Sequence, residues 1–241
     1  MENEKNKNSV AIIIPAYNEA VSLPDVISDI RKNCSEASIV VVDDGSTDNT
    51  SGVARDLGAI VLRLPVNIGY GAALQTGFKY ALKKGFDYVV IMDGDGQHLA
   101  SEIDKVLGPV RRGEYDLVIG SRYIEKDSYE GSFLRKFGSM LFAKIASFFL
   151  GFKITDPTSG FQAMNRKILK YFVTPVYPPD YPDADVLIAS KRSGFKIREV
   201  AVKMLSNSFG ESMHSGLKPL YYIFKMCFSI FLTFLRKRSM E

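Results

Sequence analysis

Short apolar runs alternate with helical patterns along most of the chain. Runs rich in β-branched and aromatic side chains, bounded by polar or glycine-containing turns, are typical of buried strands. We therefore expect strands near residues 9–15, 38–43, 59–63, 86–92, 117–121 and 196–202. Between them, apolar residues recur at helical spacing near residues 23–33, 50–57, 71–84, 101–112 and 185–193. This alternation predicts an α/β fold with a mostly parallel sheet and helices on both of its faces.

Polar and aromatic side chains follow three of the predicted strands. They are Pro15, Tyr17 and Glu19, then Asp43 and Asp44, and finally Asp93 and Asp95. The carboxyl ends of parallel strands share one edge of a sheet, so we expect these side chains to converge on one cleft. Two carboxylates separated by a glycine suit a hard divalent cation, and an aromatic ring can stack on a base. The pattern predicts a nucleotide diphosphate held by a metal, although an isolated Asp-x-Asp is more often an acidic turn.

Two further patterns have competing interpretations. Gly69 and Gly71 precede a helix as in a dinucleotide-binding loop, but no third glycine follows three residues later, which disfavours that interpretation. Asp183 and Asp185 form a second Asp-x-Asp, which follows a proline-rich loop and precedes a helix. We expect Asp185 to cap that helix, whereas Asp183 is open to a role in capping or in contacting the sugar or acceptor.

Other local signals predict structure more than chemistry. Ser101 and Asp104 have the spacing of a capping box at the start of the fourth helix. His98 lies away from any second histidine at metal-ligand spacing, so we expect it to shape its loop by hydrogen bonding.

The composition fits one enzyme domain with a short appendage. The 241 residues are 46% hydrophobic and 24% charged, which is ordinary for an α/β domain. Cys34 and Cys227 are far apart and belong to no Cys-x-x-Cys pair, so we expect a reducing compartment and no chemistry through sulfur. Residues 1–8 are polar and of mixed charge, so no signal peptide is expected.

Two segments without acidic residues combine basic and large apolar side chains. In residues 131–153, Leu134, Phe137, Leu141, Ile145 and Phe148 recur at helical spacing. A similar stripe runs through residues 217–238, where the uninterrupted apolar run would be about 15 Å of helix against a hydrocarbon core of about 30 Å. We expect both segments to lie on a membrane surface, the alternative for the first being an ordinary core helix. Nucleic acid is disfavoured, because large apolar anchors separate the basic residues.

Six ordered motifs give the chain a family resemblance. Residues 15–19, 41–48, 67–71, 92–98, 120–123 and 156–161 resemble the inverting glycosyltransferases of the GT-A fold, which is Rossmann-like. Within that fold they resemble the polyprenyl-phosphate branch typified by dolichol-phosphate mannose synthase and bacterial undecaprenyl-phosphate glycosyltransferases. Together with the apolar stripe of residues 217–238, the resemblance predicts a catalytic domain over residues 1–212 and an amphipathic helix over residues 213–241.

The resemblance also implies roles for individual residues. Mg²⁺ or Mn²⁺ would lie among Asp93, Asp95 and Gln97. The nucleotide sugar would contact Pro15, Tyr17, Glu19, Asp43, Asp44, Gly71 and Asp93. The acceptor phosphate would contact Arg122, Arg135 and Ser139, and the catalytic set would be Asp95, Asp156, Arg122 and Arg135.

The implied activity is transfer of a sugar from a UDP- or GDP-linked donor to undecaprenyl or dolichyl phosphate, at the cytoplasmic face of the membrane. The protein would be bound peripherally. The resemblance leaves open whether it has a small integral membrane partner and whether it forms a homo-oligomer. One departure concerns the loop around residues 210–212, which commonly carries a basic residue in relatives; Lys203 or His214 could substitute here. The alternatives are transfer to a saccharide or lipid-linked oligosaccharide, which needs a general base, and a non-catalytic nucleotide-sugar binding subunit of a membrane complex.

Overall fold

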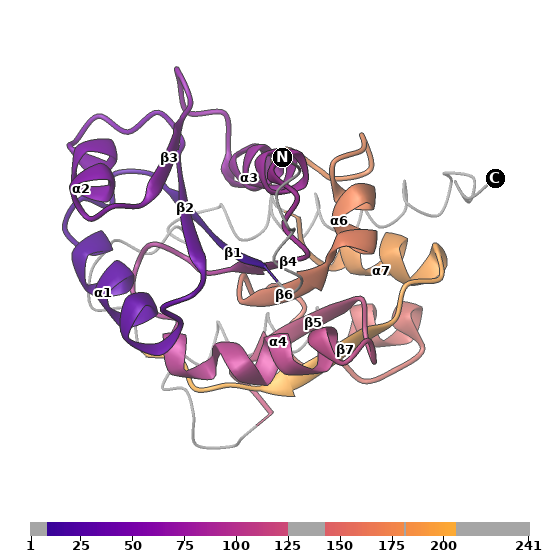
Figure 1. Cartoon of the computed structure of the whole chain (residues 1–241). Coiled ribbons are helices and arrows are strands. Elements are labelled where there is room, and N and C mark those ends of the chain that lie inside the picture. The colour runs from indigo at the N-terminus through magenta and orange to yellow at the C-terminus, as the bar shows by residue number, and fades with distance from the viewer. Residues whose placement is uncertain (1–8, 125–142, 181, 206–241) are drawn as a thin grey trace, which may run out of the picture.

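The computed structural model describes residues 9–124, 143–180 and 182–205 (Figure 1). Arg135, Ser139, His214 and the expected amphipathic helix over residues 213–241 lie outside the described residues. Within the described ranges, no helix has both the length and the apolar character needed to cross a bilayer.

One sheet carries all the described strands, in the spatial order β3-β2-β1-β4-β6-β5-β7. Every neighbouring pair is parallel except the two that involve β6. The fold is therefore α/β with a mostly parallel sheet, as expected. The strands are β1 (Val10–Ala16), β2 (Ser38–Asp43), β3 (Ile60–Arg63), β4 (Tyr88–Ile91), β5 (Leu117–Ser121), β6 (Gln162–Asn165) and β7 (Ile197–Ala201).

β1 lies at the centre of the parallel part of the sheet. Ile12 pairs with Ile39 of β2 on one side and with Val90 of β4 on the other, and every residue of β1 is buried. The chain order reverses between β1 and β4, which is where open α/β sheets leave a crevice for ligands.

The antiparallel strand β6 is absent from the sequence-based expectation. Ala163 pairs with Val90 of β4 and with Val118 of β5, so β6 fills the gap between two strands that are distant from it in sequence. Only two of its four residues are apolar, and a segment this short shows no clear period. Its partners on both sides, rather than its own sequence, make it a strand.

Helices cover both faces of the sheet (Figure 1). One buried cluster joins the sheet to α1 (Leu23–Asn33), α2 (Thr50–Asp56) and α4 (Ile103–Arg111). The other joins it to α3 (Tyr70–Lys84), α6 (Arg166–Phe172), α7 (Ala184–Arg192) and helical residues 143–150. The fold therefore has three layers.

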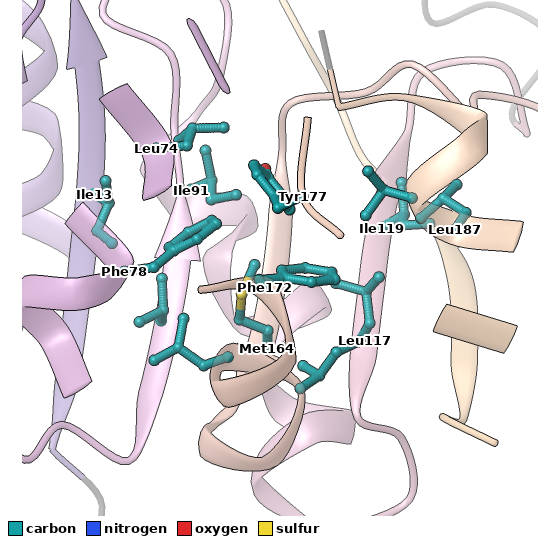
Figure 2. Packing of buried hydrophobic residues seen from close by; sticks show 14 of the residues in the cluster. Ile13, Leu74, Phe78, Ile91, Leu117, Ile119, Met164, Phe172, Tyr177 and Leu187 are labelled. Carbon is teal, nitrogen blue, oxygen red and sulfur yellow. The ribbon is translucent and has the colours of Figure 1, made fainter. Parts of the chain in front are cut away.

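Aromatic rings fill the second cluster, where α3 and α6 meet (Figure 2). The Phe78 ring lies 6.0 Å from that of Phe172 and 5.4 Å from that of Tyr177, measured between ring centroids. Gly77 lets α3 approach the sheet closely, because a Cβ atom there would stand 2.7 Å from Ile13 Cγ2. This close packing fixes the start of α3 relative to the sheet edge.

Two helix starts differ from the sequence prediction. The prediction that Ser101 and Asp104 form a capping box is wrong. Ser101 lies inside a 3₁₀ turn, η1 (Ala100–Glu102), and α4 begins at Ile103 without a side-chain cap. Asp183 occupies the N-cap position of α7, also without a side-chain cap. The expectation that Asp185 caps this helix is therefore wrong: Asp185 lies inside the first turn, where its carboxylate accepts the N–H groups of Val186 and Asp183.

Candidate active site

The loop after β1 and the loop after β2 are joined by hydrogen bonds. Asn18 adopts a left-handed conformation with φ of 59°, its N–H donates to Ser46 Oγ at 2.9 Å, and its side-chain oxygen accepts the N–H of Thr47 at 2.8 Å. The N–H of Glu19 donates to Thr50 Oγ1 at 2.9 Å. Tyr17 remains 46% exposed beside these contacts, so its ring is available to stack on a base. The contact of Tyr17 with a nucleoside stays a prediction.

Asp43 and Asp44 are buried, and both carboxylates bond to the protein itself. Asp43 accepts the N–H of Ser46 at 2.8 Å and the hydroxyl of Ser51. Burial opposes ionisation of Asp43, but the hydrogen bonds from Ser51 and Ser46 outweigh it and lower its pKa. Asp44 accepts the N–H groups of residues 68 and 69, each at 2.9 Å, and so fixes the loop before α3. Their direct contacts with a nucleotide sugar stay predictions.

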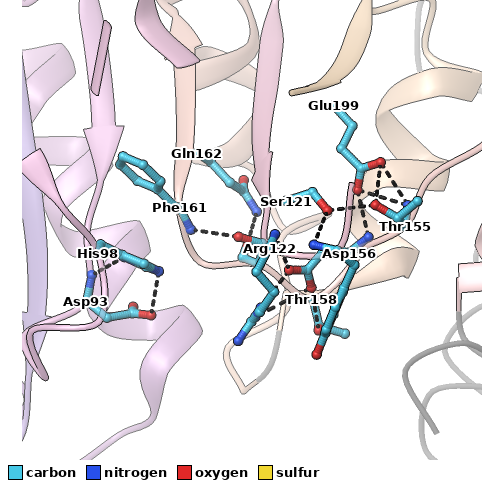
Figure 3. Close-up of polar contacts among 12 residues, drawn as sticks. Asp93, His98, Ser121, Arg122, Thr155, Asp156, Thr158, Phe161, Gln162 and Glu199 are labelled. Carbon is cyan, nitrogen blue, oxygen red and sulfur yellow. Dashed lines mark hydrogen bonds and ion pairs between the residues drawn. The ribbon is translucent and has the colours of Figure 1, made fainter. Parts of the chain in front are cut away.

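Residues 93–98 follow β4 and are called the metal loop here, after the role that the sequence predicts for them. The Tyr70 hydroxyl donates to Asp93 Oδ1 at 2.9 Å, and His98 Nε2 lies 3.6 Å from Asp93 Oδ2 (Figure 3). His98 Nδ1 accepts the N–H of Asp93 at 3.0 Å, so the imidazole proton faces the Asp93 carboxylate. Burial lowers the pKa of His98, which matches this neutral form. His98 thus shapes the loop, as expected.

Three carboxylates crowd the same place. Gln97 donates its N–H to Asp95 Oδ1 at 3.0 Å and its side-chain amide to the other oxygen. The pKa of Glu19 is raised, mainly by burial and further by the negative charges of Asp95 and Asp93. In the described part of the chain, no three histidine, cysteine or acidic side chains form a complete metal site. Oxygen donors from Asp93 and Asp95 fit a Mg²⁺ or Mn²⁺ ion that takes its other ligands from phosphate and water.

The loop of residues 156–161 packs directly on the metal loop. A Cβ atom on Gly160 would stand 2.8 Å from Asp93 Oδ2 and 2.8 Å from the Tyr70 hydroxyl. Next to it, the Phe161 ring stacks on His98 with 4.9 Å between ring centroids. The glycine therefore permits contact between two motifs that lie far apart in the sequence.

Arg122 and Asp156 form a close pair at the other end of that loop. Arg122 Nε donates to Asp156 Oδ2 at 2.7 Å, and Nη2 lies 3.4 Å from Oδ1 (Figure 3). The Asp156 side chain is fully buried, whereas that of Arg122 is 18% exposed. A guanidinium fixed along one edge is well suited to bind a phosphate. Arg135 and Ser139, expected beside it, lie outside the described residues.

Gly71 lies against the proline-rich loop. Its N–H donates to the carbonyl of Asp180 at 2.8 Å, and a Cβ atom on it would stand 2.2 Å from the carbonyl oxygen of Pro178. The first turn of α3 is thus covered by the backbone of residues 178–180, and contact of Gly71 with a nucleotide sugar stays a prediction.

The chain after β7 returns to the metal loop. Leu205 donates its N–H to the carbonyl of Gln97 at 2.9 Å, and Met204 pairs with His98 as an isolated bridge. Lys203, a candidate substitute for a basic loop residue, donates its N–H to Glu102 Oε2 at 3.0 Å.

The sequence analysis did not single out two residues of the site. Tyr70 lies within the motif at residues 67–71, and a tyrosine hydroxyl in that motif could have indicated a polar contact in the site. Glu199 lies on β7 and accepts the N–H groups of Thr155 and Asp156. Its signal was a single acid in a strand that is otherwise apolar on its buried face.

Residues 11–172 match the family model described as Glycosyl transferase family 2. Polyprenol monophosphomannose synthase of Mycolicibacterium smegmatis is 32% identical over 227 residues, which cover 89% of this chain and 84% of that protein. The UDP-N-acetylglucosamine–dolichyl-phosphate N-acetylglucosaminyltransferase of Methanococcus voltae is 29% identical, over 88% of this chain and 93% of that protein.

A solved structure shares the fold. Glucosyl-3-phosphoglycerate synthase from Mycobacterium tuberculosis, in complex with Mn²⁺ and UDP-glucose, superposes with a TM-score of 0.71 and 23% identity. The match covers 94% of this chain and 79% of that one. The likeness shows that the two proteins share a fold, and the solved protein holds Mn²⁺ and UDP-glucose.

Proposed function

The chain belongs to glycosyl transferase family 2, and on this premise we propose that it transfers one sugar from a nucleotide diphosphate sugar to a polyprenyl monophosphate. The observation that carries the proposal is the contact of Gly160 with Asp93. It brings a phosphate-binding arginine, held by Asp156, next to the loop suited to a metal and a diphosphate. Donor and acceptor phosphates then meet between the two loops.

The donor side is built from oxygen ligands. Asp93 and Asp95, with Gln97 beside them, would hold Mg²⁺ or Mn²⁺, which when bound neutralises charge that develops on the leaving diphosphate. Tyr70 and His98 orient the Asp93 carboxylate from two sides. The exposed ring of Tyr17 would stack on the base.

The acceptor brings its own negative charge, which removes the need for a strong base. An oxygen of the acceptor phosphate attacks C1 of the sugar, and the bond from C1 to the diphosphate breaks on the opposite face. The products are a nucleoside diphosphate and a polyprenyl phosphosugar with inverted C1. Asp156 is bonded to Arg122, so its role is to orient the arginine rather than to remove a proton.

The same arrangement disfavours the saccharide acceptor. A sugar hydroxyl must lose a proton as it attacks, and a general base must therefore reach it. His98 has one ring nitrogen bonded to Asp93 N–H and the other facing the Asp93 carboxylate, and Asp156 is fully buried. These groups support the fold of the site rather than proton removal.

We place the reaction at the cytoplasmic face of the membrane, with the protein bound peripherally. Phe148 supports the peripheral attachment, because it is 81% exposed on helical residues 143–150, whereas Ala146 and Leu150 face the core. The helix thus packs on the core along one face, which Ile145 and Phe149 extend, and Phe148 on its exposed side supports the membrane interpretation. An aromatic ring beside Lys144 and Lys153 suits the boundary between acyl chains and anionic head groups.

A substrate panel tests the proposal. The full chain is assayed with UDP- and GDP-linked hexoses and N-acetylhexosamines, Mg²⁺ or Mn²⁺, and a short-chain polyprenyl phosphate. The matched acceptors are the unphosphorylated polyprenol, 3-phosphoglycerate and a saccharide. We expect transfer to polyprenyl phosphate alone, which stops on chelation of the metal. Transfer to a saccharide with equal efficiency would overturn the acceptor assignment, and donor binding without any turnover would support the non-catalytic alternative.

A further inference from the structure

A buried carboxylate on β7 supports the acceptor side of the site from behind. Building on the proposed function, we propose that Glu199 is a positioning residue that sets the Arg122–Asp156 pair to receive the acceptor phosphate. Glu199 pairs with Ile119 in the sheet, so its backbone belongs to the rigid core rather than to a loop. Its side chain is only 9% exposed.

Both oxygens of Glu199 bond to the segment that carries Asp156. Oε1 accepts the N–H of Asp156 at 2.6 Å, and Oε2 accepts the N–H of Thr155 at 2.8 Å and its hydroxyl at 3.0 Å (Figure 3). The carboxylate therefore clamps two successive peptide units at the start of the loop. The position of the Asp156 side chain follows from the position of its own peptide.

The clamp continues in a fixed direction to the other member of the pair. Because the Thr155 hydroxyl donates to Glu199, its oxygen accepts the hydroxyl of Ser121, 2.6 Å away. Ser121 Oγ in turn accepts the N–H of Tyr123 at 3.1 Å. Ser121 and Tyr123 flank Arg122 in the chain, so hydrogen bonds that begin at Glu199 hold both members of the pair.

Burying the Glu199 carboxylate does not by itself stabilise the fold. The pKa of Glu199 is raised, chiefly by burial and also by the nearby charge of Asp156, so the ionised form is disfavoured at this position. An apolar residue would serve a plain strand better. The Glu199 carboxylate instead accepts hydrogen bonds from Thr155 and Asp156, in the loop where Asp156 meets the arginine.

The substitution Glu199→Gln tests the clamp. Glutamine has nearly the same volume as glutamate, but one carboxylate oxygen becomes an NH₂ group. This group would face the N–H and hydroxyl donors of Thr155 and could not accept their hydrogen bonds. We expect the KM for polyprenyl phosphate to rise about tenfold and the KM for the sugar nucleotide to change by less than about twofold. Thr155→Val removes only the hydroxyl that joins Glu199 to Ser121, so it should raise the KM for polyprenyl phosphate by a smaller factor. Thr155→Ser keeps the hydroxyl and should have the wild-type KM values.

Asp116→Asn is the matched control. Asp116 is a buried acid immediately before β5, and it accepts the N–H of Lys196 at 2.9 Å and the side-chain amide of Asn165 at 2.9 Å. It lies at the opposite end of β5 from Arg122. This substitution should lower Tm while leaving both KM values within about twofold. An equal rise of both KM values in Glu199→Gln, matched by Asp116→Asn, would overturn the positioning role.

A signal that needs no turnover separates this inference from the proposed function. The ¹⁵N NMR signal of Arg122 Nε–H, identified by its loss in Arg122→Lys, should shift in Glu199→Gln and stay in place in Asp116→Asn. If the wild type does not use polyprenyl phosphate but the signal shifts, the clamp stands and the acceptor assignment fails. If the wild type transfers sugar and neither the signal nor the KM ratio changes, the clamp fails. Should Glu199→Gln not fold, Thr155→Val gives the same readings.

Discussion

Gly160 and Asp93 are in such close contact that a single added methyl group would stand 2.8 Å from Asp93 Oδ2. The two residues lie far apart in the sequence and on different loops. Their contact unites the metal loop with the loop that carries Asp156. The glycine carries no side chain that would displace the Asp93 carboxylate from Tyr70.

Gly160→Ala should therefore disable the site without unfolding the protein. The methyl group would push the Asp93 carboxylate or the Tyr70 hydroxyl from its place, and we expect transfer to fall by at least about tenfold. Gly108→Ala is the control, since its Cβ would meet only the flexible end of Arg112 at 3.2 Å. That variant should keep full activity and gain up to about 1 kcal/mol of helix stability. Initial rates and thermal unfolding of both variants provide the measurement.

Tyr70→Phe should weaken metal binding. The hydroxyl orients Asp93 at 2.9 Å, and loss of such a supporting hydrogen bond commonly costs about ten- to a hundredfold in metal affinity. Titration of Mn²⁺ in the presence of UDP, followed by electron paramagnetic resonance, measures the affinity directly. Tyr80→Phe on the same helix should leave it unchanged. Equal Mn²⁺ affinity in Tyr70→Phe and wild type would show that Asp93 needs no such support.

Asp95→Asn keeps the side-chain volume but removes one negative charge. We expect loss of most turnover and of metal-dependent donor binding, with little change in the far-UV circular dichroism or Tm, because the Asp95 carboxylate bonds only to neighbouring Gln97 in the described contacts. Asp104→Asn, on exposed α4 surface, is the control. Calorimetric titration of UDP with and without Mn²⁺ distinguishes the two, and near-normal metal-dependent binding in Asp95→Asn would contradict the metal assignment.

Asp43 should govern part of the acid stability. Its pKa lies below the ordinary value of 3.8, since hydrogen bonds from Ser51 and Ser46 outweigh burial. The stability that its ionised form contributes is fully present above that value and is lost as the pH falls through the lower folded pKa. Asp43→Asn should accordingly reduce the free energy of unfolding at neutral pH and flatten its decline below about pH 4. Urea unfolding of both proteins across this range tests the sign, and parallel curves would refute it.

Phe148→Glu should weaken attachment to anionic vesicles. Removing one exposed phenyl ring from the acyl boundary costs about 2 kcal/mol, and the added charge is repelled by anionic lipid. Val21→Glu is the control, because Val21 is 77% exposed just before α1, which packs on the other face of the sheet from helical residues 143–150. Co-sedimentation with anionic vesicles at low and high salt measures the difference. Equal vesicle binding by the two variants would show that Phe148 does not contact the membrane.

The sequence by itself determined the framework of this protein. The apolar runs and their periods predicted the six parallel-sheet strands and five helices within a few residues, because burial on both faces of a sheet demands continuous apolar sequence. The same runs indicated where Asp93 and Asp95 emerge together, since the carboxyl ends of parallel strands share one edge. The family motifs then suggested the chemistry.

Only the tertiary structure decided how the loops meet. The formation of strand β6 and the covering of Gly71 by residues 178–180 both depend on partners that are distant in sequence. The contact of Gly160 with Asp93 and the clamp of Glu199 on Thr155 and Asp156 are of the same kind. Hydrophobic periodicity records which face of an element is buried, but it carries no information on which polar groups face one another across the fold. The geometry of those polar contacts is set only once the sheet has formed and the helices have packed on it.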